Sequence, residues 1–238
     1  MNSACGAQKN IARKHDLVND ARMLHYIDMF RHHYWQRRGQ RMLQRGKSAA
    51  AFRCFQKAVL LQNEPEDRFH LALALVGLGQ YEDALAYLDK VAQQEPDREV
   101  VLLAQAECNL MLRRWQQAED QFARLAGMRA GSKRYAGYLE MVRDPVQRDK
   151  HVIAREYFNE SQKLVEQKQP RQALQKMQEA LEVDPHNALV ANNVGSLMLL
   201  LGHSPGEACL YFEKAVALEP DNQRYRENLS WVRRKSKR

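Results

Sequence analysis

The stretch that decides the fold runs from Leu71 to Pro96 and reads LALALVGLGQYEDALAYLDKVAQQEP. Apolar residues recur at helical spacing on both sides of Gly79, and a proline follows the second run. In that second run, Ala84, Leu88 and Val91 stand at i, i+4 and i+7, which places them on one face of a helix. Glycine takes positive φ without steric cost, as a tight turn requires. The stretch therefore predicts two helices joined by a short turn.

The pattern of the second helix recurs five times along the chain. Each time, a small residue is followed four positions later by a bulky apolar one, and three later by a small or apolar one. The sets are Ala51, Phe55, Ala58; Ala84, Leu88, Val91; Ala118, Phe122, Leu125; Ala173, Met177, Ala180; and Ala208, Phe212, Ala215. The leading alanines are 33, 34, 55 and 35 residues apart. A step near 34 residues is typical of a solenoid of helix pairs, in which each pair packs on its neighbours.

Charge is concentrated at the two ends of the 238-residue chain, whose formal net charge is +8. Residues 1–50 hold ten Lys and Arg against three Asp, and residues 233–238 hold five basic side chains. Such ends attract acidic partners, nucleic acid or membrane headgroups, or they are simply solvated. Four widely spaced cysteines without a CxxC pair indicate a reducing, cytoplasmic location. No apolar run is long enough to predict a membrane span.

The repeated residues resemble the tetratricopeptide repeat family. The second unit matches best, through Leu71, Ala72, Leu75, Gly79, Tyr81, Ala84, Leu88 and Pro96. The resemblance implies an all-α, right-handed superhelical solenoid of about five helix-turn-helix repeats with a C-terminal capping helix. It also implies protein–protein interaction rather than catalysis. We call the first helix of each repeat the A helix and the second the B helix.

The expected organisation has five parts. These are a basic N-terminal helical extension (1–30), repeats one to three (31–130), an inserted helix or linker (131–153), repeats four and five (154–220), and a capping helix with a basic tail (221–238). The extension is expected either to cap the first repeat or to lie in the groove. The insertion is a degenerate half-repeat, a lid across the groove or a flexible joint. Small residues at Gly39, Ala72, Ala106, Ser161 and Gly195 are expected where A and B helices cross closely.

Motifs for catalysis or cofactor binding fail on inspection. Gly46-Lys47-Ser48 resembles the end of a phosphate-binding loop, but Arg41 stands where that loop needs glycine, and helices flank it. His25, His32 and His33 lack the further ligands that zinc requires, so we expect surface or partly packed histidines. The sequence thus predicts no catalytic residue, no metal and no cofactor.

In the tetratricopeptide repeat family the A helices line a concave groove. The resemblance places partner-binding residues at Phe69, Leu73, Leu103, Glu107, Phe158 and Asn192. Alternatively, Phe69, Leu73 and Leu103 are packed between neighbouring A helices. Where chaperone-linked members use Lys, Arg and Asn to grip a C-terminal carboxylate, this chain has Gln36, Gln40, Leu73 and Leu103. We therefore expect that it does not bind heat-shock chaperone tails.

The predicted function is that of a non-enzymatic scaffold, adaptor or chaperone that holds an apolar or amphipathic segment of a partner in this groove. The alternative is a basic solenoid that binds RNA or acidic partners through its charged ends. Salt separates the two, since phosphate contacts weaken steeply with ionic strength. Self-association is a further expectation, with the N-terminal helix filling the groove of a neighbour. Nucleic-acid binding is not expected under the first hypothesis.

Overall fold

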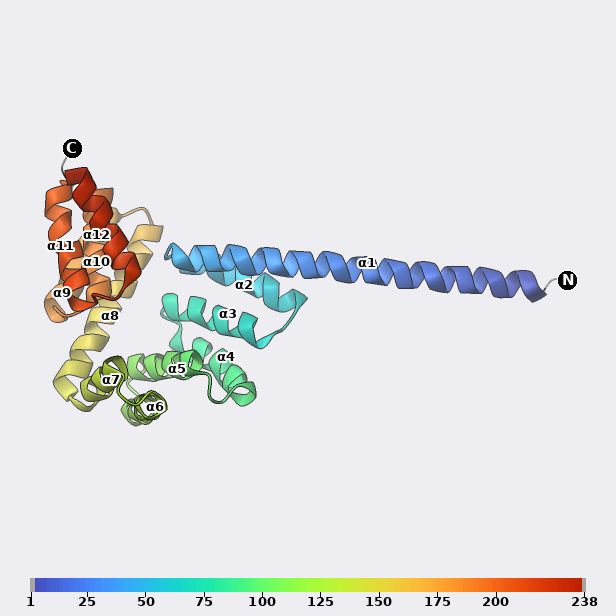
Figure 1. The fold of residues 1–238 in the computed structure, drawn as a ribbon, viewed down its shortest axis with the longest axis horizontal. Helices are drawn as coiled ribbons and strands as arrows, with labels where there is room; N and C mark the ends of the chain where they lie inside the picture. Colours follow the sequence, from blue (N-terminus) through green and yellow to red (C-terminus); the bar gives the residue numbers. More distant parts are fainter. Residues whose placement is uncertain (1–2, 237–238) are drawn as a thin grey trace. The chain divides into compact units, whose positions relative to one another are not determined.

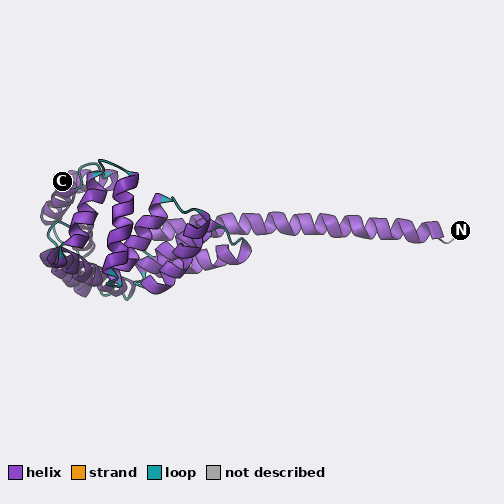
Figure 2. Ribbon diagram, turned by 90° about the horizontal axis from the view of Figure 1, so that it is seen from below, coloured by secondary structure: helices purple, strands orange, loops and turns teal. Residues whose placement is uncertain are grey.

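The computed structural model describes the backbone of residues 3–236 and the side chains of residues 23–236. Within that range the chain forms twelve α-helices and no strand (Figures 1 and 2). It divides into two compact units, Met1–Ala104 and Gln105–Arg238, with the division inside helix α5 (Glu99–Met111). The predicted all-α class, built from helix-turn-helix repeats, is confirmed.

The first unit consists of α1 (Ser3–Gln44), α2 (Ser48–Leu61), α3 (Pro65–Gly77), α4 (Tyr81–Gln94) and the start of α5. Helix α2 packs against α1, α3 packs against α2, and α4 packs against α3. Ala51 and Phe55 of α2 form a core cluster with Leu71 and Ala74 of α3. These are the repeat residues of α2 and their neighbours on the next A helix, so the repeat pattern marks the core.

Helix α1 is longer than the sequence suggested. The predicted extension over residues 1–30 is continuous with the A helix of the first repeat, because no proline or glycine interrupts the chain between Gly6 and Gly39. Its N-terminal part projects beyond α2–α4 (Figure 1). Met23, Leu24 and Ile27 are 45–62% exposed, so these three side chains are not buried against the first repeat or in a groove of the same chain. The side chains of residues 1–22, and Lys237 and Arg238 of the predicted tail, lie outside the described residues.

The second unit contains the rest of α5 and seven further helices. They are α6 (Trp115–Met128), α7 (Lys133–Arg143), α8 (Pro145–Glu166), α9 (Pro170–Val183), α10 (Ala188–Leu200), α11 (Pro205–Leu218) and α12 (Gln223–Ser236). From α6 to α12, each helix packs against the next in sequence. The main core lies between α8 and α12 and includes Met177, Val194 and Phe212. The capping helix α12 buries Tyr225, Leu229 and Val232.

The inserted segment forms one extra helix, α7, followed by a long A helix, α8. The expected boundary between the insertion and the fourth repeat, between residues 153 and 154, falls inside α8, which begins at Pro145. Asp144 sets this start, because its side chain accepts hydrogen bonds from the backbone N–H of Val146 (2.8 Å) and Gln147 (3.3 Å). Helix α7 packs on α6, where Tyr138 stacks on Phe122 with ring centroids 5.2 Å apart.

The turns between A and B helices are all closed by the same two backbone hydrogen bonds. In the first turn, Gly46 N–H donates to Leu43 O (2.9 Å) and Lys47 N–H donates to Met42 O (2.9 Å). Both bonds recur in the other four turns, and they are the pair expected for a helix ended by a residue with positive φ. The residues with positive φ in these five turns are Gly46 (69°), Gly79 (76°), Arg113 (58°), Lys168 (60°) and Gly202 (82°). Glycine is the residue type expected at such a turn, as at Gly79, whereas positive φ at Arg113 and Lys168 was not predicted.

The predicted close crossings between A and B helices are confirmed at three repeats. A Cβ atom at Gly39 would lie 2.7 Å from the ring of Phe55, and one at Gly195 would lie 2.9 Å from the ring of Phe212. In the fourth repeat the buried Ser161 Oγ donates to Ala173 O at 2.7 Å. Small residues are thus required wherever the large B-helix side chain points at its own A helix.

Candidate protein-binding surfaces

The six residues predicted to bind a partner all lie on A helices. Phe69 and Leu73 are on α3, and Leu103 is on the first half of α5, within the first unit. The second unit carries the other three, which are Glu107 on α5, Phe158 on α8 and Asn192 on α10. The structure thus presents two A-helix surfaces, one in each unit.

In the first unit Phe69 is covered, whereas Leu73 and Leu103 are only half-buried. Phe69 is 7% exposed, and the guanidinium carbon of Arg98 lies 4.6 Å from its ring centroid. Leu73 and Leu103 keep part of their surface open to solvent. Of the three, Leu73 and Leu103 are therefore the side chains that can contact a partner without rearrangement.

Arg98 is held over Phe69 by two carboxylates. It lies 2.5 Å from Glu66 and 3.0 Å from Glu95. Partial burial acts to lower the pKa of Arg98, but hydrogen bonds and charge from Glu66 and Glu95 outweigh it and raise that pKa above its ordinary value. Arg98 is therefore protonated at the edge of this surface, and the carboxylates of Glu66 and Glu95 balance its charge.

Buried polar groups tie α1 to α3 beside the same surface. His32 Nε2 lies 2.6 Å from Asp67 Oδ2, and Gln36 Nε2 donates to Asp67 Oδ1 at 2.7 Å. His32 is 2% exposed and Asp67 is fully buried. The second ring nitrogen of His32 is also buried, and it has no hydrogen-bond partner among the described residues. The pair therefore joins two helices and has no atom that a substrate can reach.

Gln40, which is exposed, also contacts α3, since its amide nitrogen lies 3.5 Å from His70 Nε2. The two glutamines that stand at chaperone-tail positions thus both face partners inside the chain. Sequence reasoning placed Gln36 and Gln40 on this face but missed Asp67, which lies one repeat further along the chain. Asp67 is the third residue of α3, whereas His32 and Gln36 stand at the first and fifth positions of the preceding repeat, so the repeat spacing gave no signal for this contact.

In the second unit Asn192 is a buried linking residue. It is 2% exposed, and its side-chain oxygen accepts a hydrogen bond from Asn228 Nδ2 at 2.8 Å. Asn228 belongs to the capping helix, so this bond joins α10 to α12. Phe158 is half-buried, and the guanidinium carbon of Arg155 lies 5.4 Å from its ring centroid. Phe158 therefore has open surface, whereas Asn192 has almost none.

Glu107 lies near two residues of the inserted helix that sequence reasoning did not include. Burial and the charge of Glu107 raise the pKa of Tyr138, although Arg134 opposes them. The guanidinium carbon of Arg134 lies 5.7 Å from the Tyr138 ring centroid.

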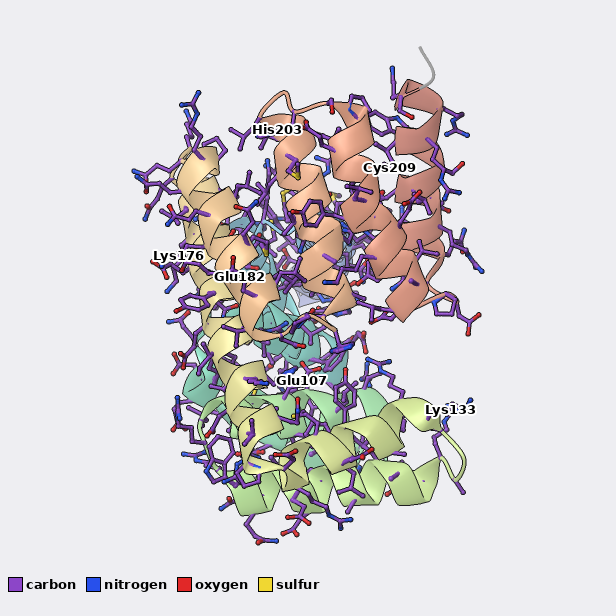
Figure 3. The ribbon with its side chains drawn as sticks, turned by 90° about the vertical axis from the view of Figure 1, so that its left-hand side faces the viewer. Glu107, Lys133, Lys176, Glu182, His203 and Cys209 are labelled. Atoms are coloured by element: carbon purple, nitrogen blue, oxygen red, sulfur yellow. The ribbon has the colours of Figure 1, made fainter. Side chains whose placement is uncertain are left out.

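His203 and Cys209 lie at the opposite end of this unit from Lys133, the first residue of α7 (Figure 3). The helical spacing of the insertion pointed to a helix there but not to its place beside Glu107.

Among the described residues, no group of three or more His, Cys, Asp or Glu side chains is placed to hold a metal ion. No helix between residues 3 and 236 is long and apolar enough to cross a membrane. Cys54 and Cys209 form no disulfide with any described residue.

Comparison with known proteins gives two family matches. Residues 158–223 match the family described as tetratricopeptide repeat. Residues 44–125 match the family described as anaphase-promoting complex, cyclosome, subunit 3. The two matches fall on either side of the inserted helix α7.

Among individual proteins, the chain is 22% identical over 210 residues to human protein O-mannosyl-transferase TMTC1. The match covers 81% of this chain and 24% of that protein, so the chain spans about a quarter of its relative's length. Among solved structures, MamA 41-end from Desulfovibrio magneticus RS-1 is 20% identical with TM-score 0.39, covering 81% of this chain and 97% of that one. The second TPR domain of human RPAP3, in complex with an HSP70 peptide, is 14% identical with TM-score 0.45, covering 49% and 98%.

Proposed function

We propose that this chain, which belongs to the tetratricopeptide repeat family, is a non-enzymatic scaffold that binds a partner protein along its A helices. The bound element would be an apolar or amphipathic segment. On the first unit Leu73 and Leu103 would provide the contacts and Phe69 would support them. On the second unit Phe158 would provide the contact, and Asn192 and Glu107 would support or flank it.

The observation that carries this proposal is the contrast between polar and apolar side chains on the A helices. Several polar groups there have partners within the chain, as in the contacts of Asp67 with His32 and Gln36. Leu73 and Leu103 in the first unit, and Phe158 in the second, instead keep open surface on their A helices. Half-buried apolar side chains on these helices favour an apolar ligand over a highly charged one.

The same contacts support the expectation that chaperone tails are not the ligand. A C-terminal carboxylate needs free donors, and the amides of Gln36 and Gln40 already face Asp67 and His70. Releasing Gln36 would leave the buried Asp67 with one contact fewer, and an unmet hydrogen bond to a buried charge costs about 1–3 kcal/mol. We therefore propose a ligand recognised through side chains rather than through its terminus.

We propose no transferase activity for this chain, although its human relative is named as a transferase. The phosphate-loop and zinc patterns considered above are both incomplete in this sequence. We also propose a reducing, cytoplasmic setting, which is supported by the absence of a disulfide at Cys54 and Cys209 among the described residues.

The test is a selection of binding peptides from a displayed random library at about 0.1 M and about 0.5 M salt. Selected peptides are then measured by calorimetry against the wild type, Leu103→Glu and Leu210→Glu. Leu210 is a matched control, since it is an apolar side chain 66% exposed on the B helix α11. We expect apolar peptides whose affinity survives salt, falls about tenfold or more in Leu103→Glu and is unchanged in Leu210→Glu.

Three results would contradict the proposal. Acidic peptides that bind only at low salt would favour the charged ends instead. Equal binding by Leu103→Glu and the wild type would place the ligand elsewhere. Unfolding of Leu103→Glu, together with full binding by the milder Leu103→Ala, would show that Leu103 is a core residue.

A further inference from the structure

A hollow of about 710 Å³ opens in the first unit, lined by α1, α2, α3 and α4. Helix α2 supplies most of its lining, and none of the six predicted A-helix residues takes part. Leu71, Met42 and Cys54 give it an apolar floor. Its volume lies in the range of sites that enclose several side chains of a ligand.

The charged side chains that line the hollow are all cations. They are Arg38 of α1 and Arg53 and Lys57 of α2. Each is exposed, and none has a carboxylate partner among the described residues. Arg38 donates to the Tyr34 hydroxyl at 2.6 Å, and Lys57 Nζ lies 4.1 Å from the ring centroid of Trp35. This contrasts with Arg98, which two glutamates neutralise.

An apolar anchor stands among these cations. Leu60 is 85% exposed, although it is a leucine in the last turn of a packed helix. Arg53, Lys57 and Leu60 stand at i, i+4 and i+7 and therefore share one face of α2. The half-buried rings of Trp35 and Tyr87 complete the wall. The hollow thus offers apolar contact in its interior and unpaired positive charge at its rim.

We propose that this hollow is a second protein-binding site, and that it takes an acidic amphipathic segment of a partner. Apolar side chains of that segment would enter between Leu60, Trp35 and Met42. Its carboxylates would pair with Arg38, Arg53 and Lys57. Unpaired charge on one side favours opposite charge on the other, which brings specificity and faster association. The hollow is separate from the A-helix surfaces, so either binding proposal can be disproved without affecting the other.

A nucleic acid fits the hollow less well. Base stacking needs an open aromatic face, and Lys57 already covers the ring of Trp35. The floor formed by Leu71, Met42 and Cys54 also has no polar group that would read a base edge. Both features favour a peptide with apolar anchors.

The probe is a peptide about 16 residues long that forms an amphipathic helix, with Leu at i, i+4, i+7 and i+11 and Glu at most other positions. One matched peptide replaces every Glu by Gln, another replaces every Leu by Ala, and a single-stranded RNA of similar length completes the set. Fluorescence anisotropy at about 0.1 M salt measures binding to the full chain. Only the peptide with both Leu and Glu should bind well.

Two variants and one control locate the site. Arg53→Glu with Lys57→Glu should weaken binding of the acidic peptide about tenfold or more. Leu60→Ala should weaken it several-fold without affecting the fold, because Leu60 is 85% exposed. The control, Lys150→Glu with Lys163→Glu, makes the same charge change at exposed positions of α8 and should leave binding unchanged.

The proposal is overturned if the acidic peptide does not bind below about 1 mM, or if the control weakens it as much as the α2 variant. Binding of the RNA in place of the peptide would make the site one for nucleic acid. A third possible occupant is a second copy of this chain, which sedimentation of the protein alone tests. If the wild type self-associates and the Arg53→Glu, Lys57→Glu variant does not, a second copy fills the hollow instead.

Discussion

Replacing Gly195 by alanine is expected to destabilise the packing of α10 on α11 by about 1 kcal/mol. The new Cβ would lie 2.9 Å and 3.0 Å from two atoms of the Phe212 ring, and 3.1 Å from the carbonyl oxygen of Ala208. Phe212 is 3% exposed and cannot swing into solvent, and the carbonyl is part of the backbone of α11. Overpacking of this kind costs about 1–3 kcal/mol. Alanine returns about 0.8–1.0 kcal/mol through its higher helix propensity, so the net loss is about 1 kcal/mol.

Gly137 in α7 is a matched control, because a Cβ there would meet no atom within 4 Å. Gly137→Ala keeps the propensity gain without the clash and should stabilise the protein by about 0.8–1.0 kcal/mol. The two variants are thus expected to differ by about 2 kcal/mol, with opposite signs.

Urea unfolding followed by far-UV circular dichroism measures both variants. Repeat arrays can unfold in more than one step, so hydrogen exchange of the α10 and α11 amides should be followed as well. Protection there should fall in Gly195→Ala and stay unchanged in Gly137→Ala. If Gly195→Ala is as stable as the wild type, the reasoning that small residues are required at these crossings is refuted.

Two further predictions concern a turn and a tyrosine. Lys168 has a φ of 60° at a position where three other turns have glycine. Lys168→Gly should therefore raise the free energy of unfolding, measured by urea titration, by about 0.5 kcal/mol. A loss of stability would show that positive φ carries no strain at this turn. Burial raises the pKa of Tyr225 to about 12 from 10, which favours the neutral phenol in the folded state. Its contribution to stability is therefore complete below pH 10 and is lost as pH rises through about 12. An absorbance titration should show a late component, to which Tyr138 also contributes, and this component should shrink in Tyr225→Phe. Unchanged curves would contradict the assignment.

The core could be predicted from sequence because it depends on local spacing. All five leading alanines are fully buried, and Phe55 and Phe122, at the middle position of two sets, are fully buried as well. Turns were predictable only where glycine marked them. At Arg113 and Lys168 the same backbone hydrogen bonds form without glycine, so the helix pairs on either side, and not the turn residue, decide the conformation.

The candidate sites were harder to predict because they depend on contacts between repeats. The family resemblance predicted the A-helix face of Phe69 but gave no sign that Arg98 covers it. His32 was expected to be at the surface or partly packed, and its burial could not be foreseen because its partner Asp67 lies 35 residues away. The hollow beside Leu60 had no signal in the family resemblance, since that resemblance directs attention to the A helices. Whether a charged side chain has a partner depends on its neighbours in three dimensions, and the sequence repeat does not reveal these neighbours.

The buried carboxylate of Asp67 also sets a limit on how the chain can be shortened. Its two partners, His32 and Gln36, are one helical turn apart on α1. A fragment that starts ahead of His32 keeps both of them, and loses mainly the exposed part of α1. A fragment that starts beyond Gln36 loses both partners together with the part of α1 that covers Asp67, so water would reach this carboxylate and the polar link between α1 and α3 would be lost. A shortened form of this protein therefore keeps that link only if it begins before His32.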